Sequence, residues 1–388
     1  MTPDRERLHR ITHALRAANL DALVCALPTN VLLLSGYWPV VGTSIAAVTR
    51  EGALGLLVPE DEQQLATCGW ANHLQTFKPS ALDQIRPLQD AVAAPLRAVL
   101  QQLGPLRRMG CDAGSANEPA SYAAMNLYGA ELPRILRRVV PGAKIAGARH
   151  MLARLKSVLT MREVDRVRLA CRIAAEAFKI GARAIEAGME EVEIAAQFTA
   201  SLTTIGTGIP GVQRAGGFAM CMSGPNSAEA AAAYARSRAR TVQRGDFVLV
   251  HCNSYIDGFW TDITRTYVAG DPDAKQRKIQ TALAQARAAA LNAIDPGARA
   301  SDVDRAARRI LAEHGFAKEF KHATGHGVGF AAIDANALPR LHPKSPDILE
   351  PGMVFNVEPA VYIEGWGGAR HCDTVVLTEN RVEVLSDF

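Results

Sequence analysis

The chain has 388 residues, of which 48% are hydrophobic and 21% are charged, and its formal net charge is +4. This balance is typical of a folded globular protein and excludes a disordered or fibrous chain. The positive charge is small and spread along the sequence. That argues against a nucleic-acid partner, because phosphate-binding proteins gather positive charge on one face.

The N-terminal segment 1–20 has the pattern of a charged amphipathic helix and not of a signal peptide. The most apolar region, 31–48, is interrupted by Gly36, Pro39 and Gly42 and is too short to span a bilayer. Seven cysteines are scattered without a CxxC pair, which excludes a disulfide framework and a zinc ribbon. We therefore expect a soluble cytoplasmic protein with no membrane partner.

The first part of the chain alternates helix-like and strand-like segments. An apolar stripe at helical spacing marks one face of the opening helix (Leu8, Ile11, Leu15 and Leu20). Short apolar runs bounded by turn residues predict buried strands at 21–27 and 52–58, and a helical pattern returns at 87–102. These elements predict a small α/β domain over residues 1–155.

The second part, residues 156–388, is organised differently. Helical patterns cover 162–204, with an interruption near Gly188, and later 272–293 and 300–315. Strand patterns are found at 245–252, 259–268, 353–358 and 369–377. Runs of strands beside runs of helices predict an α+β domain in which helices cover an antiparallel sheet.

Polar side chains occur on these predicted strands where a core would take apolar ones. Strand alternation puts His251 on one face of its strand, Asp262 and Thr264 on one face of the next, and Asn356 and Glu358 on one face of a third. Several half-buried polar faces in one sheet are costly unless their groups are paired. Converging carboxylates, imidazoles and thiols satisfy each other when they bind a cation.

Two further segments add to this set. The stretch 321–330 offers His322 and His326 among glycines, which favours a strand or loop whose backbone approaches another segment closely. In 369–377, alternation puts Arg370 and Cys372 on one face and His371 and Asp373 on the other. A buried cysteine can pack, react or hold a metal, and its residue type alone favours packing.

Several motifs in the second half resemble the pita-bread metallopeptidase family, which includes methionine aminopeptidases, Xaa-Pro aminopeptidases, prolidases and creatinases. They are SGPN, DGFWTDITRTY, HATGHGVGF, EPGMVFNVEPAVY and GGARHCDT, at 223–226, 257–267, 322–330, 350–362 and 367–374. The first half, including LPTNVLLLSGY at 27–37, resembles the N-terminal domain of the creatinase, prolidase and Xaa-Pro aminopeptidase branch. The resemblance implies a small α/β N-terminal domain followed by a catalytic pita-bread domain.

The resemblance also implies a set of metal ligands, since family peptidases hold two ions with two Asp, one His and two Glu. Asp262, His326 and Glu358 match the second Asp, the His and the first Glu. His251 stands where the family has its first Asp. Cys372 stands where it has the last, bridging Glu, two residues after the matching Arg370.

The substrate pocket departs from the family as well. Tyr234 stands in place of a pocket His, Ile333 and Asp334 in place of a His-Glu pair, and Thr264 in place of a Glu of creatinases. The pocket histidine that remains is His322. The resemblance therefore implies Glu358 and His322 as catalytic residues, and His322, Tyr234 and Arg370 as substrate-binding residues.

The remaining donor set favours one metal ion per chain. Asp262, His326, Glu358 and Cys372 offer two oxygens, one nitrogen and one sulfur, a shell suited to zinc or iron(II) more than to manganese, because thiolate is a soft ligand. A second ion held by His251, Asp262 and Cys372 is less favoured, and a site without metal is the alternative.

Three functions are compatible with these residues. The first is a metal-dependent hydrolase of a C–N bond in a dipeptide or small amide, like an Xaa-Pro peptidase. The second is a creatinase-like hydrolase or lyase of a small non-peptide metabolite with altered or absent metal, because a fold does not fix its reaction. The third is an inactive binding protein. Family members with this N-terminal domain are commonly dimers, so we expect a homodimer.

Overall fold

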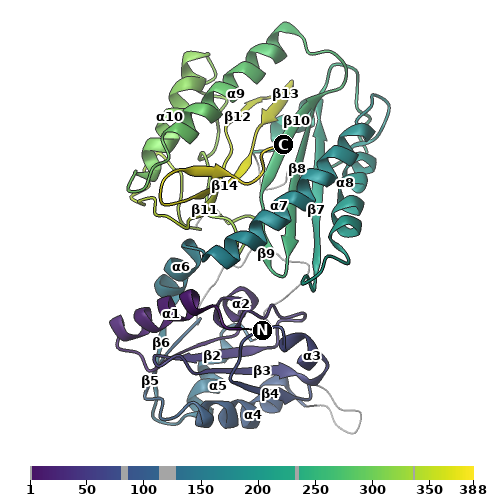
Figure 1. The fold of residues 1–388 in the computed structure, drawn as a ribbon. Helices are drawn as coiled ribbons and strands as arrows, with labels where there is room; N and C mark the ends of the chain where they lie inside the picture. The colour runs from purple at the N-terminus through teal and green to yellow at the C-terminus, as the bar shows by residue number, and fades with distance from the viewer. Residues whose placement is uncertain (1, 80–85, 113–127, 232–235, 335–336) are drawn as a thin grey trace. The chain divides into compact units, whose positions relative to one another are not determined.

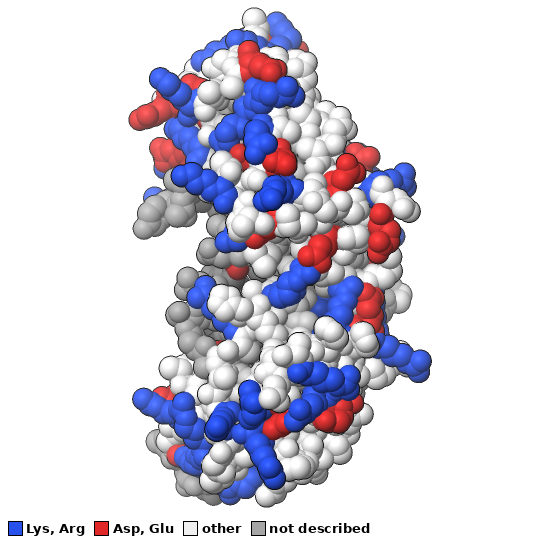
Figure 2. Space-filling view, turned by 90° about the vertical axis from the view of Figure 1, so that its left-hand side faces the viewer, with Lys and Arg blue, Asp and Glu red and all other residues white. Residues whose placement is uncertain are grey.

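The computed structural model describes residues 2–79, 86–112, 128–231, 236–334 and 337–388 (Figure 1). The chain divides into two compact units, Met1–Lys156 and Ser157–Phe388. Among the described residues, no helix is long and apolar enough to cross a membrane. On the face shown in Figure 2, basic and acidic side chains are interspersed.

The first unit contains a six-stranded mixed sheet in the order β4-β3-β2-β1-β5-β6. Its strands are β1 (Ala22–Cys25), β2 (Ile45–Thr49), β3 (Leu54–Pro59), β4 (His73–Phe77), β5 (Arg108–Cys111) and β6 (Lys144–Gly147). β2 is antiparallel to both of its neighbours, while the other pairs are parallel. Two of these strands correspond to the predicted runs 21–27 and 52–58.

Helices cover both faces of this sheet (Figure 1). Apolar residues of α4 (Leu88–Gln102) and α5 (Glu131–Val139) form one core with the alternate strand residues Val24 and Leu57. On the other face α1 (Arg5–Ala17) and α2 (Pro28–Ser35) contact β2. The short elements η1 (Glu60–Glu62), α3 (Gln63–Ala66) and α6 (Arg149–Ser157) complete the unit. The predicted α/β fold of the first part is confirmed.

The second unit contains antiparallel strands in three groups. The first is β7 (Ala215–Ser223), β8 (Phe247–Ile256), β9 (Phe259–Trp260) and β10 (Ile263–Val268), in the order β10-β8-β7 with β9 paired to β8. The second is β11 (Val354–Val357), β14 (Asp373–Leu377) and β15 (Val382–Val384), and the third is β12 (Ala360–Ile363) with β13 (Gly367–Arg370). A bridge between Thr264 and Cys372 joins the first group to the segment between β13 and β14.

Helices pack on two sides of these strands (Figure 1). α7 (Met161–Gly181) and α8 (Glu191–Gly206) pack on β7 and β8, and η2 (Ala182–Ala184) follows α7. α9 (Ala274–Asn292) and α10 (Ala300–Glu313) share a core with β11, β12 and β13. The short η3 (Gly224–Glu229) follows β7. The predicted α+β architecture, with helices over antiparallel strands, is confirmed.

Local chemistry explains where several elements begin and turn. Thr160 caps α7 in a capping box with Glu163, so the helical pattern near residue 150 is divided into α6 and α7. The predicted interruption of the helical pattern 162–204 near Gly188 is confirmed, and Gly188, between α7 and α8, has a φ of 103°. Asp257 and Gly258 both have positive φ, as the tight turn between β8 and β9 requires.

Candidate active site

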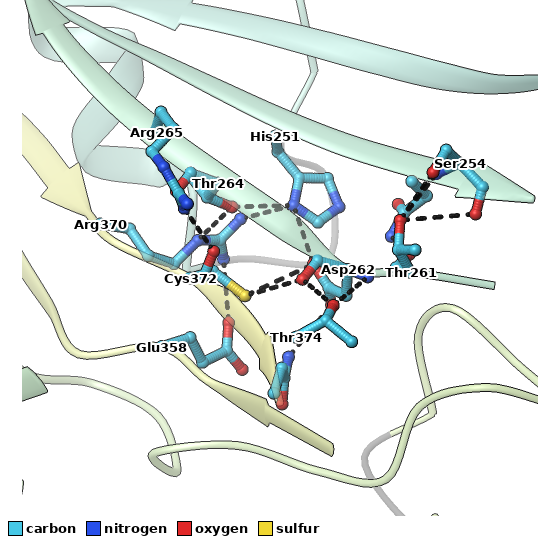
Figure 3. Close-up of polar contacts among 12 residues, drawn as sticks. His251, Ser254, Thr261, Asp262, Thr264, Arg265, Glu358, Arg370, Cys372 and Thr374 are labelled. Carbon is cyan, nitrogen blue, oxygen red and sulfur yellow. Dashed lines mark hydrogen bonds and ion pairs between the residues drawn. The ribbon is translucent and has the colours of Figure 1, made fainter. Parts of the chain in front are cut away.

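The predicted ligand residues converge where the strand groups of the second unit meet, and Figure 3 shows four of them, His251, Asp262, Glu358 and Cys372. His251 lies on β8, Asp262 lies directly before β10, and Glu358 directly follows β11. Cys372 lies between β13 and β14, while His326 lies in the irregular segment after α10. All five side chains are buried. The sequence therefore predicted correctly that these distant segments come together.

Asp262 is at the centre of the contacts among these residues. Its Oδ1 lies 3.5 Å from His251 Nδ1, and its Oδ2 lies 3.6 Å from His326 Nε2. The Asn356 amide donates to Asp262 Oδ2 at 3.2 Å and lies 3.3 Å from His326 Nε2. Asn356 thus bridges two of the predicted ligands through hydrogen bonds.

Cys372 points toward Asp262, as strand alternation predicted. Its Sγ lies 3.2 Å from the backbone oxygen of Asp262 and 3.7 Å from its Oδ1. His371 and Asp373 face the other way and pair with each other at 3.3 Å. Burial raises the pKa of the Cys372 thiol well above its ordinary value, and the Asp262 and Glu358 carboxylates raise it further. This direction opposes the thiolate form that a metal ligand needs.

Arg370 reaches three of the surrounding groups from the end of β13 (Figure 3). Its Nη2 donates to His251 Nδ1 at 2.8 Å, its Nε donates to Thr264 Oγ1 at 3.0 Å, and its Nη1 lies 3.6 Å from Glu358 Oε2. Burial lowers the pKa of His251 to about 4, a shift that Asp262 opposes and Arg370 reinforces. His251 is therefore a neutral imidazole next to a cation.

His322 lies beside these groups and is held by α10. Its Nδ1 donates to the Ala323 carbonyl at 2.7 Å, so its Nε2 accepts from the Tyr362 hydroxyl at 3.1 Å. Arg308, which is paired with Asp304 on the same helix, donates to the His322 carbonyl at 2.9 Å. Burial lowers the pKa of His322, partly against the Glu358 carboxylate.

Sequence reasoning did not identify Tyr362 or Asp304 as part of this region. Tyr362 lies on β12 with its hydroxyl toward His322, and burial raises its pKa to about 12. Its position in the stretch EPAVY, close after Glu358, was a signal that could have found it. Tyr234, predicted to bind substrate, lies outside the described residues. Ile333, predicted to stand in place of a pocket histidine, is 44% exposed.

The arrangement does not fit a carboxylate-bridged pair of metal ions. Within the part of the chain that the structure describes, no group of three or more His, Cys, Asp or Glu side chains is ready to hold a metal. Cys372 offers a thiol at the position predicted for a bridging carboxylate, and the accepting nitrogen of His251 is bonded to Arg370. The spacing around Asp262 is nevertheless near the roughly 3.4–3.6 Å that separates two ligand atoms on one tetrahedral zinc.

Comparisons with known proteins cover both units. The model of Metallopeptidase family M24 matches residues 165–379, and that of the Creatinase/Prolidase N-terminal domain matches residues 7–154. An Xaa-Pro dipeptidase of Pyrococcus furiosus is 28% identical over 383 residues, or 98% of each chain.

Solved structures give the same result. Dipeptidase PepE from Mycobacterium ulcerans has a TM-score of 0.74 and 26% identity, over 99% of this chain and 95% of that one. The prolidase from Pyrococcus horikoshii is 24% identical and has a TM-score of 0.78 over 99% and 98% of the two chains, which shows a shared fold.

Proposed function

The chain belongs to metallopeptidase family M24, and we propose from this premise that it is a metal-dependent hydrolase of a C–N bond in a dipeptide or small amide. The observation that carries the proposal is the convergence of His326 and Cys372 on Asp262, beside the His322–Tyr362 pair. Relatives named Xaa-Pro dipeptidase and prolidase support an Xaa-Pro dipeptide as the substrate class.

Family M24 implies a divalent metal cofactor. We propose that Asp262, His326, Cys372 and Glu358 hold no more than one ion per chain, and that zinc or iron(II) binds in preference to manganese because of the sulfur ligand. Binding requires the Asn356 amide to move from between Asp262 and His326. A bound ion would polarise the scissile carbonyl and acidify a water molecule.

Glu358 is the proposed proton carrier. Its contact with Arg370 is a 3.6 Å ion pair at one oxygen, so the other oxygen can accept a proton as long as it is not tightly ligated to the ion. It takes a proton from the water whose oxygen attacks the carbonyl carbon. When the C–N bond breaks, it returns that proton to the leaving nitrogen, which gives one carboxylic acid and one amine.

His322, Arg370 and Tyr234 are the proposed substrate-binding residues. Because Nε2 of His322 is an acceptor, it suits a hydroxyl or N–H donor of the substrate or of Tyr362. Tyr234 and Ile333 replace groups that would bind a peptide and stabilise its tetrahedral intermediate. We therefore propose that turnover of Xaa-Pro dipeptides is weak compared with that of an ordinary prolidase.

A substrate panel tests this function. The chain is loaded separately with zinc, iron(II) or manganese and is incubated with Xaa-Pro dipeptides, other dipeptides and N-acyl amides, and released amines are measured. We expect hydrolysis with zinc or iron(II) and a loss of about 10²–10⁴-fold in His322→Gln. His314→Gln, at a partly exposed histidine whose bond to Gln285 lies at the surface, is the matched control and should retain activity. The absence of hydrolysis with every substrate and metal would contradict the proposal.

We also propose that the chain works as a cytoplasmic homodimer. The seven described cysteines are all free thiols, which a reducing compartment maintains. Light scattering after size exclusion tests the assembly, because a mass equal to one chain would contradict it.

A further inference from the structure

His251 has a polar environment that is at odds with a role as a metal ligand. Its Nδ1 lies 2.8 Å from Nη2 of Arg370. A guanidinium has N–H donors and no acceptor, so Nδ1 must be the unprotonated nitrogen of the ring. A neutral imidazole has one such nitrogen, and the other carries the proton. The lone pair that a metal would need is therefore already bonded to Arg370.

The guanidinium is fixed in this position by two further contacts. Nε donates to Thr264 Oγ1 at 3.0 Å, and Nη1 pairs with Glu358 at 3.6 Å. The backbone N–H of Arg370 donates to Thr266 Oγ1 at 3.0 Å. Arg370 is only 9% exposed and His251 only 5%, so neither side chain can turn into solvent to release the other.

A carboxylate at position 251 would behave differently. Two oxygens offer about four lone-pair sites, so a carboxylate can accept from an arginine and bind a cation at the same time. An imidazole cannot do both. The residue at position 251 therefore determines whether a metal ion next to Arg370 would have a ligand on β8.

We propose that His251 is a positioning residue for Arg370 and not a metal ligand, and that the His251–Arg370 pair occupies the place of a second ion. The guanidinium of Arg370 then supplies the positive charge in place of that ion, paired with Glu358 and close to Asp262. The inference rests on the proposed function only in treating Asp262, His326, Cys372 and Glu358 as the ligands of the remaining ion.

Zinc stoichiometry provides the first test. In Arg370→Met the Nδ1 of His251 loses its guanidinium donor and keeps the Thr264 hydroxyl at 3.1 Å, a donor that can rotate away from it. Asp262 Oδ1 lies 3.5 Å from this nitrogen and is itself 3.7 Å from Cys372 Sγ. We expect this variant to retain one more zinc per chain after dialysis than the wild type, and Arg370→Met/His251→Phe to lose that gain. Arg287→Met is the matched control, since it removes an arginine from Asp373 and leaves Arg370 in place. An unchanged zinc content in Arg370→Met would overturn the proposal.

Nitrogen NMR of the ¹⁵N-histidine-labelled wild type provides a second test, which does not depend on the folding of Arg370→Met. Signals of His251 and His326 are assigned from their loss in His251→Phe and His326→Gln. We expect His251 to show an unprotonated Nδ1 that does not shift when zinc is added, while the His326 signal shifts. A zinc-induced shift of His251 would overturn the inference. An unchanged His326 beside an unprotonated, unshifted His251 would contradict the proposed metal site and still support the inference.

Discussion

Glu191, the first residue of α8, is predicted to be a major stabilising residue of the second unit. Its carboxylate is wholly buried and accepts four hydrogen bonds. Oε1 accepts from the backbone N–H and the hydroxyl of Ser223 at 2.6 and 2.8 Å. Oε2 accepts from Asn226 Nδ2 at 2.6 Å and from the backbone N–H of Arg238 at 2.9 Å. The carboxylate thus ties both ends of the segment 223–238, which contains Tyr234, to α8.

Glu191→Gln keeps the shape of the side chain and removes two of its four hydrogen bonds. The new amide can retain one oxygen for Ser223, but its NH₂ then faces the donors of Asn226 and Arg238. Rotating the Asn226 amide would restore one bond and break its bond to the Arg236 carbonyl. A buried hydrogen bond to a charged group contributes about 1.5–3 kcal/mol, so losing two should lower the free energy of unfolding by about 3–6 kcal/mol.

Urea unfolding measures this loss in the unit that contains it. Trp260 and Trp366 belong to the second unit, while Trp38 and Trp70 belong to the first. Replacing the latter two by Phe therefore leaves a fluorescence signal from the second unit alone.

Glu193→Gln is the matched control for Glu191→Gln. It lies on the same helix, is exposed, and accepts from the Glu190 N–H at 2.9 Å, a bond that Gln can keep. Its effect should stay within about 0.5 kcal/mol. A difference between the two variants below about 1 kcal/mol would refute the reasoning about the four donors.

Three other substitutions test neighbouring features. Cys372→Ser should weaken zinc binding at least about tenfold in a competition titration, because a hydroxyl is a poor ligand for a soft ion, and should change the melting temperature little. Unchanged zinc binding with a large drop in melting temperature would indicate a packing role. Gly325→Ala would place its Cβ 2.0 Å from the Asn356 backbone oxygen and should lower the free energy of unfolding in urea by at least about 1–3 kcal/mol. Gly367→Ala is the control and should be tolerated, because the nearest atom to its Cβ would lie at 3.4 Å. Asp373→Ala leaves Arg265 and Arg287 without their buried carboxylate and should cost about 3–5 kcal/mol. Glu383→Ala, at the partly exposed pair with Arg168, should cost at most about 1 kcal/mol, and equal losses would contradict this.

The fold was predictable from the sequence to the extent that local patterns determine it. Apolar periodicity located the main helices, two of the six strands of the first unit and most strands of the second, but β7 was among the strands that it missed. Its sequence AGGFAMCMS begins with glycines, which weaken a strand pattern. The reason for Gly217 is tertiary, because a Cβ there would lie 2.3 Å from the Asn253 backbone oxygen of β8.

The sequence predicted on which face of its strand each site residue lies, but not the hydrogen-bond partners of these residues. Strand alternation correctly predicted that Cys372 points toward Asp262 and His371 away from it. It gave no information on the bond between His251 and Arg370 or on the position of Asn356 between two ligand positions. Residue spacing reports the direction of a side chain along its own strand, whereas a hydrogen-bond partner depends on how separate strands meet.

Positions 251 and 372 should control different properties of the site. His251 limits the number of ions because its lone pair is bonded to Arg370, whereas Cys372 determines which metal is preferred because it supplies sulfur. His251→Asp alone should therefore bind two zinc ions and little manganese. Cys372→Glu alone should bind one ion, with manganese now retained when zinc is absent, and the double variant should bind two manganese ions under the same conditions. Metal content after dialysis against zinc and, in a separate experiment, against manganese, measured on all four proteins, separates the two effects. A second ion in Cys372→Glu alone would show that the lone pair of His251 is not what limits the number, and the bond to Arg370 would then have no bearing on metal binding.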